Sequence, residues 1–174
     1  MAKTSDPIEE VGKIVQKLED LGLQPVLIGG MALVILGSRR VTRDFDFLVS
    51  DKKEQIRLLT EIFYKRNLEL TSRTDKDGNI LQTIDNAKIA AIRIQLDAPK
   101  SVHFFNRKTG LKIDLLFDFP LAAKDLAARA SIKKIGSYVF RIASRADLMK
   151  LKKIAYEDRH FAADAQDLEF LKKL

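Results

Sequence analysis

Two aspartates with a single residue between them are the clearest sign of chemistry in this sequence. Asp44 and Asp46 stand in the segment Arg43-Asp44-Phe45-Asp46-Phe47-Leu48-Val49. In an extended strand, residues two apart point to the same face, so both carboxylates project together and the apolar side chains line the other face. Hard divalent cations such as Mg²⁺ bind carboxylate oxygens and keep open positions for phosphate oxygens. The pair therefore predicts a cation site for phosphoryl or nucleotidyl transfer, with a strand whose polar face is merely solvated as the alternative.

A glycine pair, Gly29-Gly30, comes shortly before the two aspartates. The apolar run Pro25-Val26-Leu27-Ile28 predicts a short buried strand ahead of it, and the apolar residues from Met31 to Leu36 predict a helix behind it. At such a strand-to-helix turn, backbone amides can approach an anion because no Cβ stands in the way. We therefore expect the pair to bind the phosphates of a nucleotide, with a plain tight turn as the alternative.

A third carboxylate, Asp114, lies in the strand expected over Leu111 to Phe117, with apolar residues on both sides of it. Burying a charge is costly unless a cation or a hydrogen-bond donor faces it, so Asp114 needs a partner. The two candidates are a metal site shared with the first two aspartates and a neighbouring lysine or arginine. Asp118 is a competing third acid, but its place at the end of the strand favours helix capping.

The composition limits the class of protein. The chain has 174 residues, of which 46% are hydrophobic and 32% charged, and it contains no cysteine, which excludes disulfides and thiolate chemistry. We expect a single domain with a catalytic core over about residues 1–119 and a mainly helical segment over about 120–174. No apolar run is long enough to span a bilayer, and Met1 to Pro7 lacks the apolar core of a signal peptide. A cytoplasmic protein with no membrane partner is expected.

The charge of the chain favours polyanionic partners. Thirty-one basic residues exceed twenty-four acidic ones, which gives a net charge of +7. Basic side chains steer polyanions at long range and gain from the release of their counterions. Nucleotides and RNA fit this description. The alternative is a solvated basic surface without a nucleic-acid partner, because many basic proteins bind none.

Capping residues and hydrophobic periodicity predict one α/β unit around these residues. Asp6-Pro7-Ile8-Glu9 starts a helix that Gly22 ends, and Ser144-Arg145-Ala146-Asp147 opens another helix. The stretch from Leu68 to Leu96 is ambiguous, because parts of it fit either strand alternation or a helical face. The other expected elements are a basic loop over 37–43, a strand over 44–49, a helix over 51–65, a hairpin of strands over 102–105 and 111–117, helical structure after residue 120 with a strand over 138–142, and a last helix over about 163–174.

The two histidines of the chain show no metal-ligand spacing. His103 lies in an apolar strand, and His160 lies at a helix junction. Neither is near another histidine in the sequence, so we assign no chemistry to either residue.

Together these residues resemble a known family, the nucleotidyltransferase superfold of the DNA polymerase β type, in its minimal bacterial branch that includes the AbiEii-like toxins. Gly29-Gly30 followed by Arg40-Val41-Thr42-Arg43-Asp44-Phe45-Asp46 is similar to the Gly-Gly and Arg-x-Thr-x-Asp-h-Asp pattern of that branch, where h is apolar, and Asp114 is similar to its third acid. Segments near the C-terminus, Ala146 to Ala155, Arg159 and Asp164 to Leu168, are similar to its closing helices. One position departs from the pattern, since Ala163 stands before Asp164 where relatives commonly carry a lysine.

The resemblance implies an α/β nucleotidyltransferase fold, a small mixed β-sheet flanked by helices with a helical C-terminal segment. It implies transfer of an NMP group from an NTP to an acceptor hydroxyl, with Mg²⁺, or Mn²⁺ in its place, held by Asp44, Asp46 and Asp114. The acceptor would be an RNA end such as that of tRNA, ahead of a protein hydroxyl or a small molecule, and the protein would be a toxin with a cognate antitoxin. The residues expected to contact the nucleotide are Gly29, Gly30, Arg40, Thr42, Arg43 and Lys152.

Two other functions fit the same residues. A noncatalytic protein of this fold would use its basic surface for nucleic acid, and its binding would not need a divalent cation. A metal-dependent phosphodiesterase would use the same carboxylates but would not release pyrophosphate. Three acids in one arrangement favour catalysis over the binding protein, and release of pyrophosphate would separate the transferase from the phosphodiesterase.

Overall fold

A computed structural model describes residues 6–174 of the chain. Residues 1–5 lie outside the described residues, and with them part of the segment for which no signal peptide is expected. The first helix, α1 (Pro7–Asp20), begins where the capping residues predict it, because Oδ1 of Asp6 accepts a hydrogen bond from the backbone N–H of Ile8 at 3.0 Å. Gly22, with φ of +80°, follows the end of this helix.

Eight strands form one mixed sheet, in the order β4-β3-β5-β6-β2-β1-β8-β7. β2 runs parallel to β6, β1 runs parallel to β8, and the other neighbours pair antiparallel. The sheet therefore mixes both directions, as predicted. The strands are β1 (Val26–Ile28), β2 (Asp44–Val49), β3 (Glu69–Thr74), β4 (Ile80–Ile84), β5 (Ser101–Phe105), β6 (Lys112–Phe117), β7 (Ser131–Ile135) and β8 (Tyr138–Ile142).

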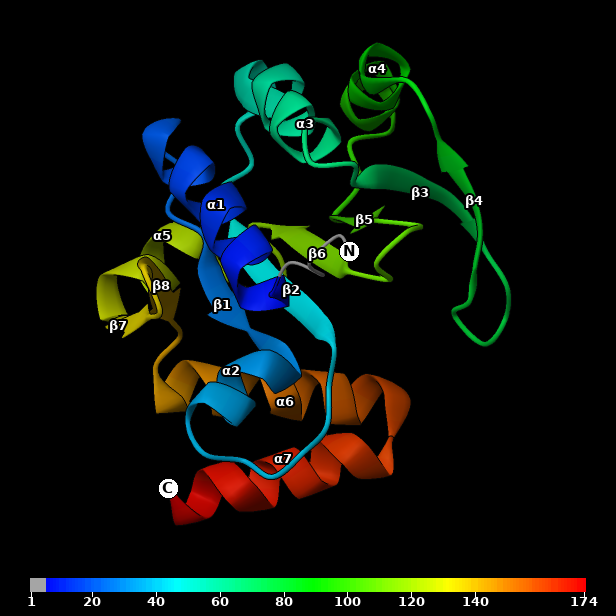
Figure 1. The fold of residues 1–174 in the computed structure, drawn as a ribbon. Coiled ribbons are helices and arrows are strands. Elements are labelled where there is room, and N and C mark those ends of the chain that lie inside the picture. The colour runs from blue at the N-terminus through cyan, green and yellow to red at the C-terminus, as the bar shows by residue number, and fades with distance from the viewer. Residues whose placement is uncertain (1–5) are drawn as a thin grey trace.

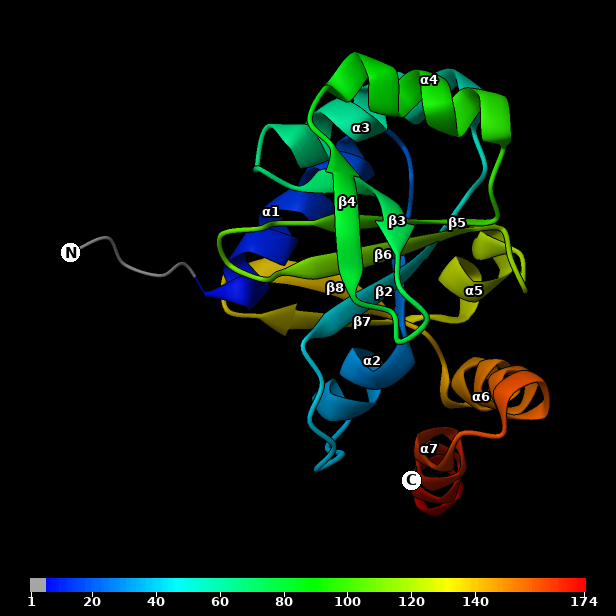
Figure 2. The same cartoon turned by 90° about the vertical axis from the view of Figure 1, so that its right-hand side faces the viewer.

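Most of the other helices lie at two ends of the molecule, and α5 lies beside the sheet. Figures 1 and 2 show α3 and α4 side by side at one end and α6 and α7 side by side at the other, with α2 between α7 and the sheet. Their bounds are α2 (Gly29–Ile35), α3 (Ile56–Tyr64, after a 3₁₀ turn at Lys53–Gln55), α4 (Ala87–Asp97), α5 (Ala123–Arg129), α6 (Arg145–Arg159) and α7 (Ala162–Lys173). No helix in the described range is long and apolar enough to cross a membrane.

The alternation in β2 gives the two faces that the sequence predicts. Phe45 and Phe47 are buried in the hydrophobic core, which also contains the apolar stripe of α1. On the same side, Phe63 of α3 stacks on Phe104 of β5 with 4.0 Å between the ring centroids. Because side chains alternate along a strand, the aspartates of β2 point to the opposite face.

Three parts of the fold differ from the sequence prediction or resolve its ambiguity. The helix expected over 51–65 begins only at Ile56 as an α-helix. The ambiguous stretch forms β3, β4 and α4, and the first two extend the sheet to one edge. The sequence predicts helical structure up to β8, but α5 stops at Arg129 and β7 follows. Pairing of β7 with β8 supplies the backbone hydrogen bonds there, so the tertiary contact overrides the helical composition.

Candidate active site

Strand register brings two of the three predicted acids together. β2 and β6 run parallel with Asp46 directly opposite Asp114. On the other side of β2, Asp46 is opposite Ile28, the residue before Gly29. Asp114 is only 8% exposed, as expected for an acid within an apolar strand. A pair of carboxylates therefore lies in the middle of the sheet, beside the turn that starts α2.

Asp44 lies at the edge of this pair. It is the first residue of β2 and is exposed, on the same face of the strand as Asp46. Its backbone N–H faces Oγ1 of Thr42 at 3.4 Å, so Thr42 shapes the entry into the strand. Within residues 6–174, no three His, Asp or Glu side chains converge on a point where an ion would fit as they lie. The three acids share one face, but only two of them are in register.

The two acids of this register pair differ in their proton affinity. Burial, the negative charge of Asp114, a hydrogen bond with that carboxyl group and the charge of Asp44 raise the pKa of Asp46 to about 7, although the Lys152 charge opposes this. Burial also acts to raise the pKa of Asp114, but a hydrogen bond and the charge of His103, together with Lys112, lower it below its ordinary value. Asp46 is therefore only partly ionised near neutral pH, and a positive charge beside the pair would favour the ionised form of both acids.

The glycine pair is shaped by the groups that face it. Gly29 has φ of +71°, and a Cβ at this position would collide with Oδ2 of Asp46. A Cβ on Gly30 would lie 3.0 Å from the guanidinium carbon of Arg40. Among the described residues, no side chain caps the start of α2. The two glycines therefore let the side chains of Asp46 and Arg40 approach the backbone closely, which a plain tight turn does not require.

The predicted cations Arg40 and Lys152 are both held by α7. Arg40 forms an ion pair with Asp167, and Lys152 Nζ lies 2.9 Å from Oδ2 of the same carboxylate. Lys152 Nζ is also 3.5 Å from Asp164, which in turn accepts hydrogen bonds from Arg159 at 2.9 and 3.0 Å. Both aspartates are buried. The resemblance covers these aspartates without giving them a role. In the structure they form ion pairs with the basic side chains Arg40, Lys152 and Arg159.

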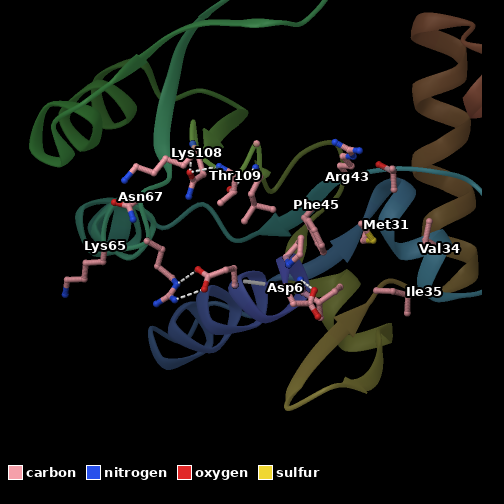
Figure 3. Close-up of a pocket in the computed structure, with 18 residues that line it drawn as sticks. Asp6, Met31, Val34, Ile35, Arg43, Phe45, Lys65, Asn67, Lys108 and Thr109 are labelled. Atoms are coloured by element: carbon pink, nitrogen blue, oxygen red, sulfur yellow. Dashed lines mark hydrogen bonds and ion pairs between the residues drawn. The ribbon is translucent and has the colours of Figure 1, made fainter. Parts of the chain in front are cut away.

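Arg43 and Thr42 lie beside a different space. The cavity of about 840 Å³ drawn in Figure 3 is lined by Thr42, Arg43 and Phe45, together with residues of α1, α2 and the β5–β6 turn. Phe45 belongs to the core face of β2, opposite the aspartates. The structure therefore brings Gly29, Gly30, Arg40 and Lys152 close to the acids, and places Arg43 on the cavity side.

Asp118 contacts the start of α5, as its position predicts, although the N-cap residue of that helix is Ala122. Its Oδ1 accepts a hydrogen bond from the backbone N–H of Ala123, the first residue of α5, at 2.8 Å. Its Oδ2 accepts one from the backbone N–H of Asp51 at 2.9 Å. With both oxygens engaged by the backbone, Asp118 does not compete with Asp114 for the site.

His103 is the residue of this site that the sequence interpretation missed. Its Nδ1 lies 2.6 Å from Oδ1 of Asp114, and β5 places the two residues directly opposite each other. The signal was present in the sequence, because the predicted hairpin around Asn106 to Gly110 sets this register once its strands are aligned. His160 follows the end of α6 and packs edge-on against Tyr156, with 5.3 Å between the ring centroids.

The donor set fits a hard divalent cation. All three acids offer oxygen ligands, which Mg²⁺ and Mn²⁺ accept. The absent Cβ of Gly29 lets Oδ2 of Asp46 lie close to the turn, and a nearby positive charge would oppose the burial and negative charges that raise the pKa of Asp46. Coordination by all three acids would require the exposed Asp44 side chain to turn toward the pair.

Comparison with solved structures shows which fold this is. No family profile matches the chain, and no curated protein matches it. The lincosamide antibiotic adenylyltransferase LnuA, bound to lincomycin, is similar over 94% of this chain and 95% of its own, with a TM-score of 0.56 and 10% identity. An antigenic nucleotidyltransferase-like protein from Paracoccidioides brasiliensis matches over 96% and 76%, with a TM-score of 0.60 and 17% identity. The antibiotic-resistance factor ANT(2'')-Ia matches over 94% and 81%, with a TM-score of 0.59 and 11% identity. The chain has the nucleotidyltransferase fold.

Proposed function

We propose that this protein is a metal-dependent nucleotidyltransferase, which transfers an NMP group from an NTP to an acceptor hydroxyl. The observation that carries the proposal is the register pair of Asp46 and Asp114 against the Gly29 turn, on this fold. Fold alone does not define an activity, so the argument rests on the chemistry of these residues. Asp44, Asp46 and Asp114 would hold Mg²⁺ or Mn²⁺, which would neutralise the phosphate oxygens and polarise the reacting phosphorus.

The residues of the chain have separate tasks in this reaction. The acceptor hydroxyl attacks the α-phosphorus of the NTP in line with the leaving group, a new P–O bond forms, and the bond to pyrophosphate breaks. Asp114 completes the metal site or takes up the hydroxyl proton. The backbone N–H groups at Gly29 and Gly30, at the start of α2, bind phosphate oxygens.

The positively charged side chains of the site neutralise the leaving group. Arg40 and Lys152 lie beside the acids and are held in place by Asp167, so they can face the charge that develops on pyrophosphate. Thr42 supports the start of β2, whereas Arg43 must turn from the cavity side to reach the nucleotide.

Exchange of single carboxyl oxygens tests the assignment. Asp46→Asn and Asp114→Asn are each expected to lower Mg²⁺-dependent transfer from labelled NTPs by at least about 100-fold, because each removes a charge that the cation needs. Asp125→Asn, an exposed change on α5, is the matched control and should retain full activity. Pyrophosphate release separates a transferase from a phosphodiesterase. Unchanged transfer by Asp46→Asn would refute the proposal.

The acceptor that we propose is an RNA end, with tRNA first. The net charge of +7 and the basic loop at 37–43 support it, and so does the resemblance to the AbiEii-like toxins. LnuA was solved with lincomycin, so a small-molecule acceptor belongs in the same assay. The protein is therefore incubated with each labelled NTP and, in separate reactions, with total RNA, tRNA, protein or lincomycin. Label on lincomycin or protein and none on RNA would refute the RNA acceptor.

The toxin role has its own test. Induced expression of the protein alone is expected to stop growth, and the Asp46→Asn variant is expected to be harmless. A small antitoxin would restore growth with the unchanged protein. Normal growth with active protein would contradict the toxin role and leave the transfer reaction in place.

The basic charge also favours the second candidate, a noncatalytic nucleic-acid-binding protein. This candidate predicts salt-sensitive RNA binding that EDTA does not change. Binding of the NTP by the transferase should be lost in EDTA.

A further inference from the structure

The hydrogen bond between His103 and Asp114 is built into the sheet. His103 Nδ1 and Asp114 Oδ1 are 2.6 Å apart. An ionised carboxylate can only accept, so the proton of this bond lies on Nδ1 of His103. The two residues are directly opposite in the antiparallel β5–β6 ladder, so regular backbone pairing fixes the distance between their Cα atoms.

The two oxygens of Asp114 have different surroundings. Oδ1 is engaged by His103, whereas Oδ2 faces the more distant Lys112, whose Nζ is 3.7 Å away. Asp46 lies in register on the other neighbouring strand. The terminal torsion of an aspartate is broad, so without a partner its carboxylate would rotate. His103 removes that freedom by holding Oδ1 from the β5 side, and β2 with Asp46 pairs along the other side of β6.

We infer that His103 is a positioning residue, which holds Oδ1 of Asp114 and thereby presents Oδ2 to the site shared with Asp46. The inference rests on the proposed nucleotidyl transfer and adds a residue that this proposal did not include. His103 itself does not touch the reacting atoms. It acts as the hydrogen-bond partner of Asp114, which is a proposed metal ligand. Loss of such a partner typically lowers metal affinity or activity by about 10- to 100-fold.

The chain offers a matched set of variants. His103→Phe keeps a ring but removes the donor, and His103→Asn keeps an N–H donor near the position of Nδ1. His160→Asn is the control, because the other histidine is exposed and has φ of +53°, which asparagine tolerates. His103 is half exposed, with 43% of its side chain accessible, so neither change at this position fills a closed core.

Two measurements test the role. The first is kcat and KM for the NTP with Mg²⁺, and the second is the Kd for Mn²⁺ without nucleotide, measured by electron paramagnetic resonance. For His103→Phe we expect kcat to fall about 10- to 100-fold with KM within about twofold, and the Mn²⁺ Kd to rise about tenfold. His103→Asn should recover most of both losses, and His160→Asn should match the unchanged protein.

The outcomes separate this inference from the proposed function. If the unchanged protein transfers nucleotides and His103→Phe does so equally well with the same Mn²⁺ Kd, the positioning role is overturned and the transferase stands. If the unchanged protein transfers no nucleotide, the proposed transferase function is wrong, and the Mn²⁺ titration still decides the role of His103. Absence of Mn²⁺ binding, or equal Kd values for the unchanged protein and His103→Phe, overturns the positioning role. Should His103→Phe fail to fold, His103→Leu replaces it, and equal loss in the Asn and Leu variants also counts against the role.

Discussion

At the scale of single residues, Gly29 joins the glycine turn to the acid pair. Its backbone has φ of +71°, a left-handed conformation that side chains with a Cβ disfavour. Independently, the space of its missing Cβ is taken by Oδ2 of Asp46. Two separate physical reasons therefore require glycine at this position, and the second of them exists only because the site is assembled.

Gly29→Ala tests whether the approach of Asp46 matters beyond the backbone conformation. Gly22→Ala is the control, because Gly22 has φ of +80° and a Cβ there would meet no described atom within 4 Å. We expect Gly22→Ala to lower the free energy of unfolding by about 1 kcal/mol and Gly29→Ala by about 2–4 kcal/mol, since the second change adds a steric clash. Urea denaturation measures both. Equal losses would show that Asp46 moves away at no cost.

At the scale of elements, the start of α6 is fixed by a network that also reaches α5. The Ser144 side chain accepts a hydrogen bond from the backbone N–H of Asp147 at 3.1 Å, as the capping sequence predicts. Arg129, the last residue of α5, donates two hydrogen bonds of 3.0 Å to the Asp147 carboxylate. α6 carries Lys152, so this network helps to set where that lysine enters the site.

Asp147 is expected to make stability depend on pH. Burial acts to raise its pKa, but hydrogen bonds from Arg129 and Ser144 lower the pKa below the ordinary aspartate value. A lowered folded-state pKa stabilises the protein at pH values above the unfolded-state pKa, and this contribution is lost as pH falls through the folded-state value. Asp147→Asn should therefore lower the free energy of unfolding by about 1–2 kcal/mol at pH 7.

The same variant should lose its defect in acid. As pH falls below about 4, the ordinary range of aspartate, the difference between the two proteins should shrink, because Asp147 is protonated first in the unfolded state and, at lower pH, in the folded state as well. Urea denaturation between pH 7 and pH 3 measures this difference. A constant difference over that range would mean that the carboxylate charge makes no contribution.

Elements with strong signals in their own residues were predicted, whereas a strand that forms only by pairing with another strand was not. The caps of α1 and α6, the alternation of β2 and the β5–β6 hairpin all follow from neighbouring residues. β7 depends on pairing with β8, and its residues alone read as a continuation of helical sequence. The contact of His103 was within reach of the sequence through the hairpin register, whereas the raised pKa of Asp46 depends on burial that a sequence pattern does not measure.

At the scale of the whole molecule, α7 closes the site from the far end of the chain. Arg40 and its partner Asp167 are separated by 127 positions, and Lys152 binds the same carboxylate. Figure 1 shows α6 and α7 packed together beside α2, the helix that Gly29 begins. No local pattern in the sequence specifies this pairing. The fold selects it by bringing the loop before β2, α6 and α7 to one place.

Because Asp167 is buried between two cations, its removal should cost more than the loss of a surface ion pair. Asp167→Leu leaves Lys152 and Arg40 with one carboxylate fewer, and we expect the free energy of unfolding to fall by roughly 3–5 kcal/mol. Glu10→Gln is the control, because it removes the negative charge on α1 that pairs with Arg66. It should lower the free energy of unfolding by about 1 kcal/mol or less. Urea denaturation measures both changes.

A double variant shows whether the loss comes from unpaired charge or from missing contact. Lys152→Met removes one of the two cations that Asp167→Leu leaves with one carboxylate fewer. The double variant should therefore recover a substantial part of the stability lost in Asp167→Leu. The Lys152→Met change is used here only for stability, because that lysine belongs to the proposed nucleotide site. If the double variant is as unstable as the sum of the two single changes, the cations do not depend on Asp167, and α7 is held by its apolar contacts instead.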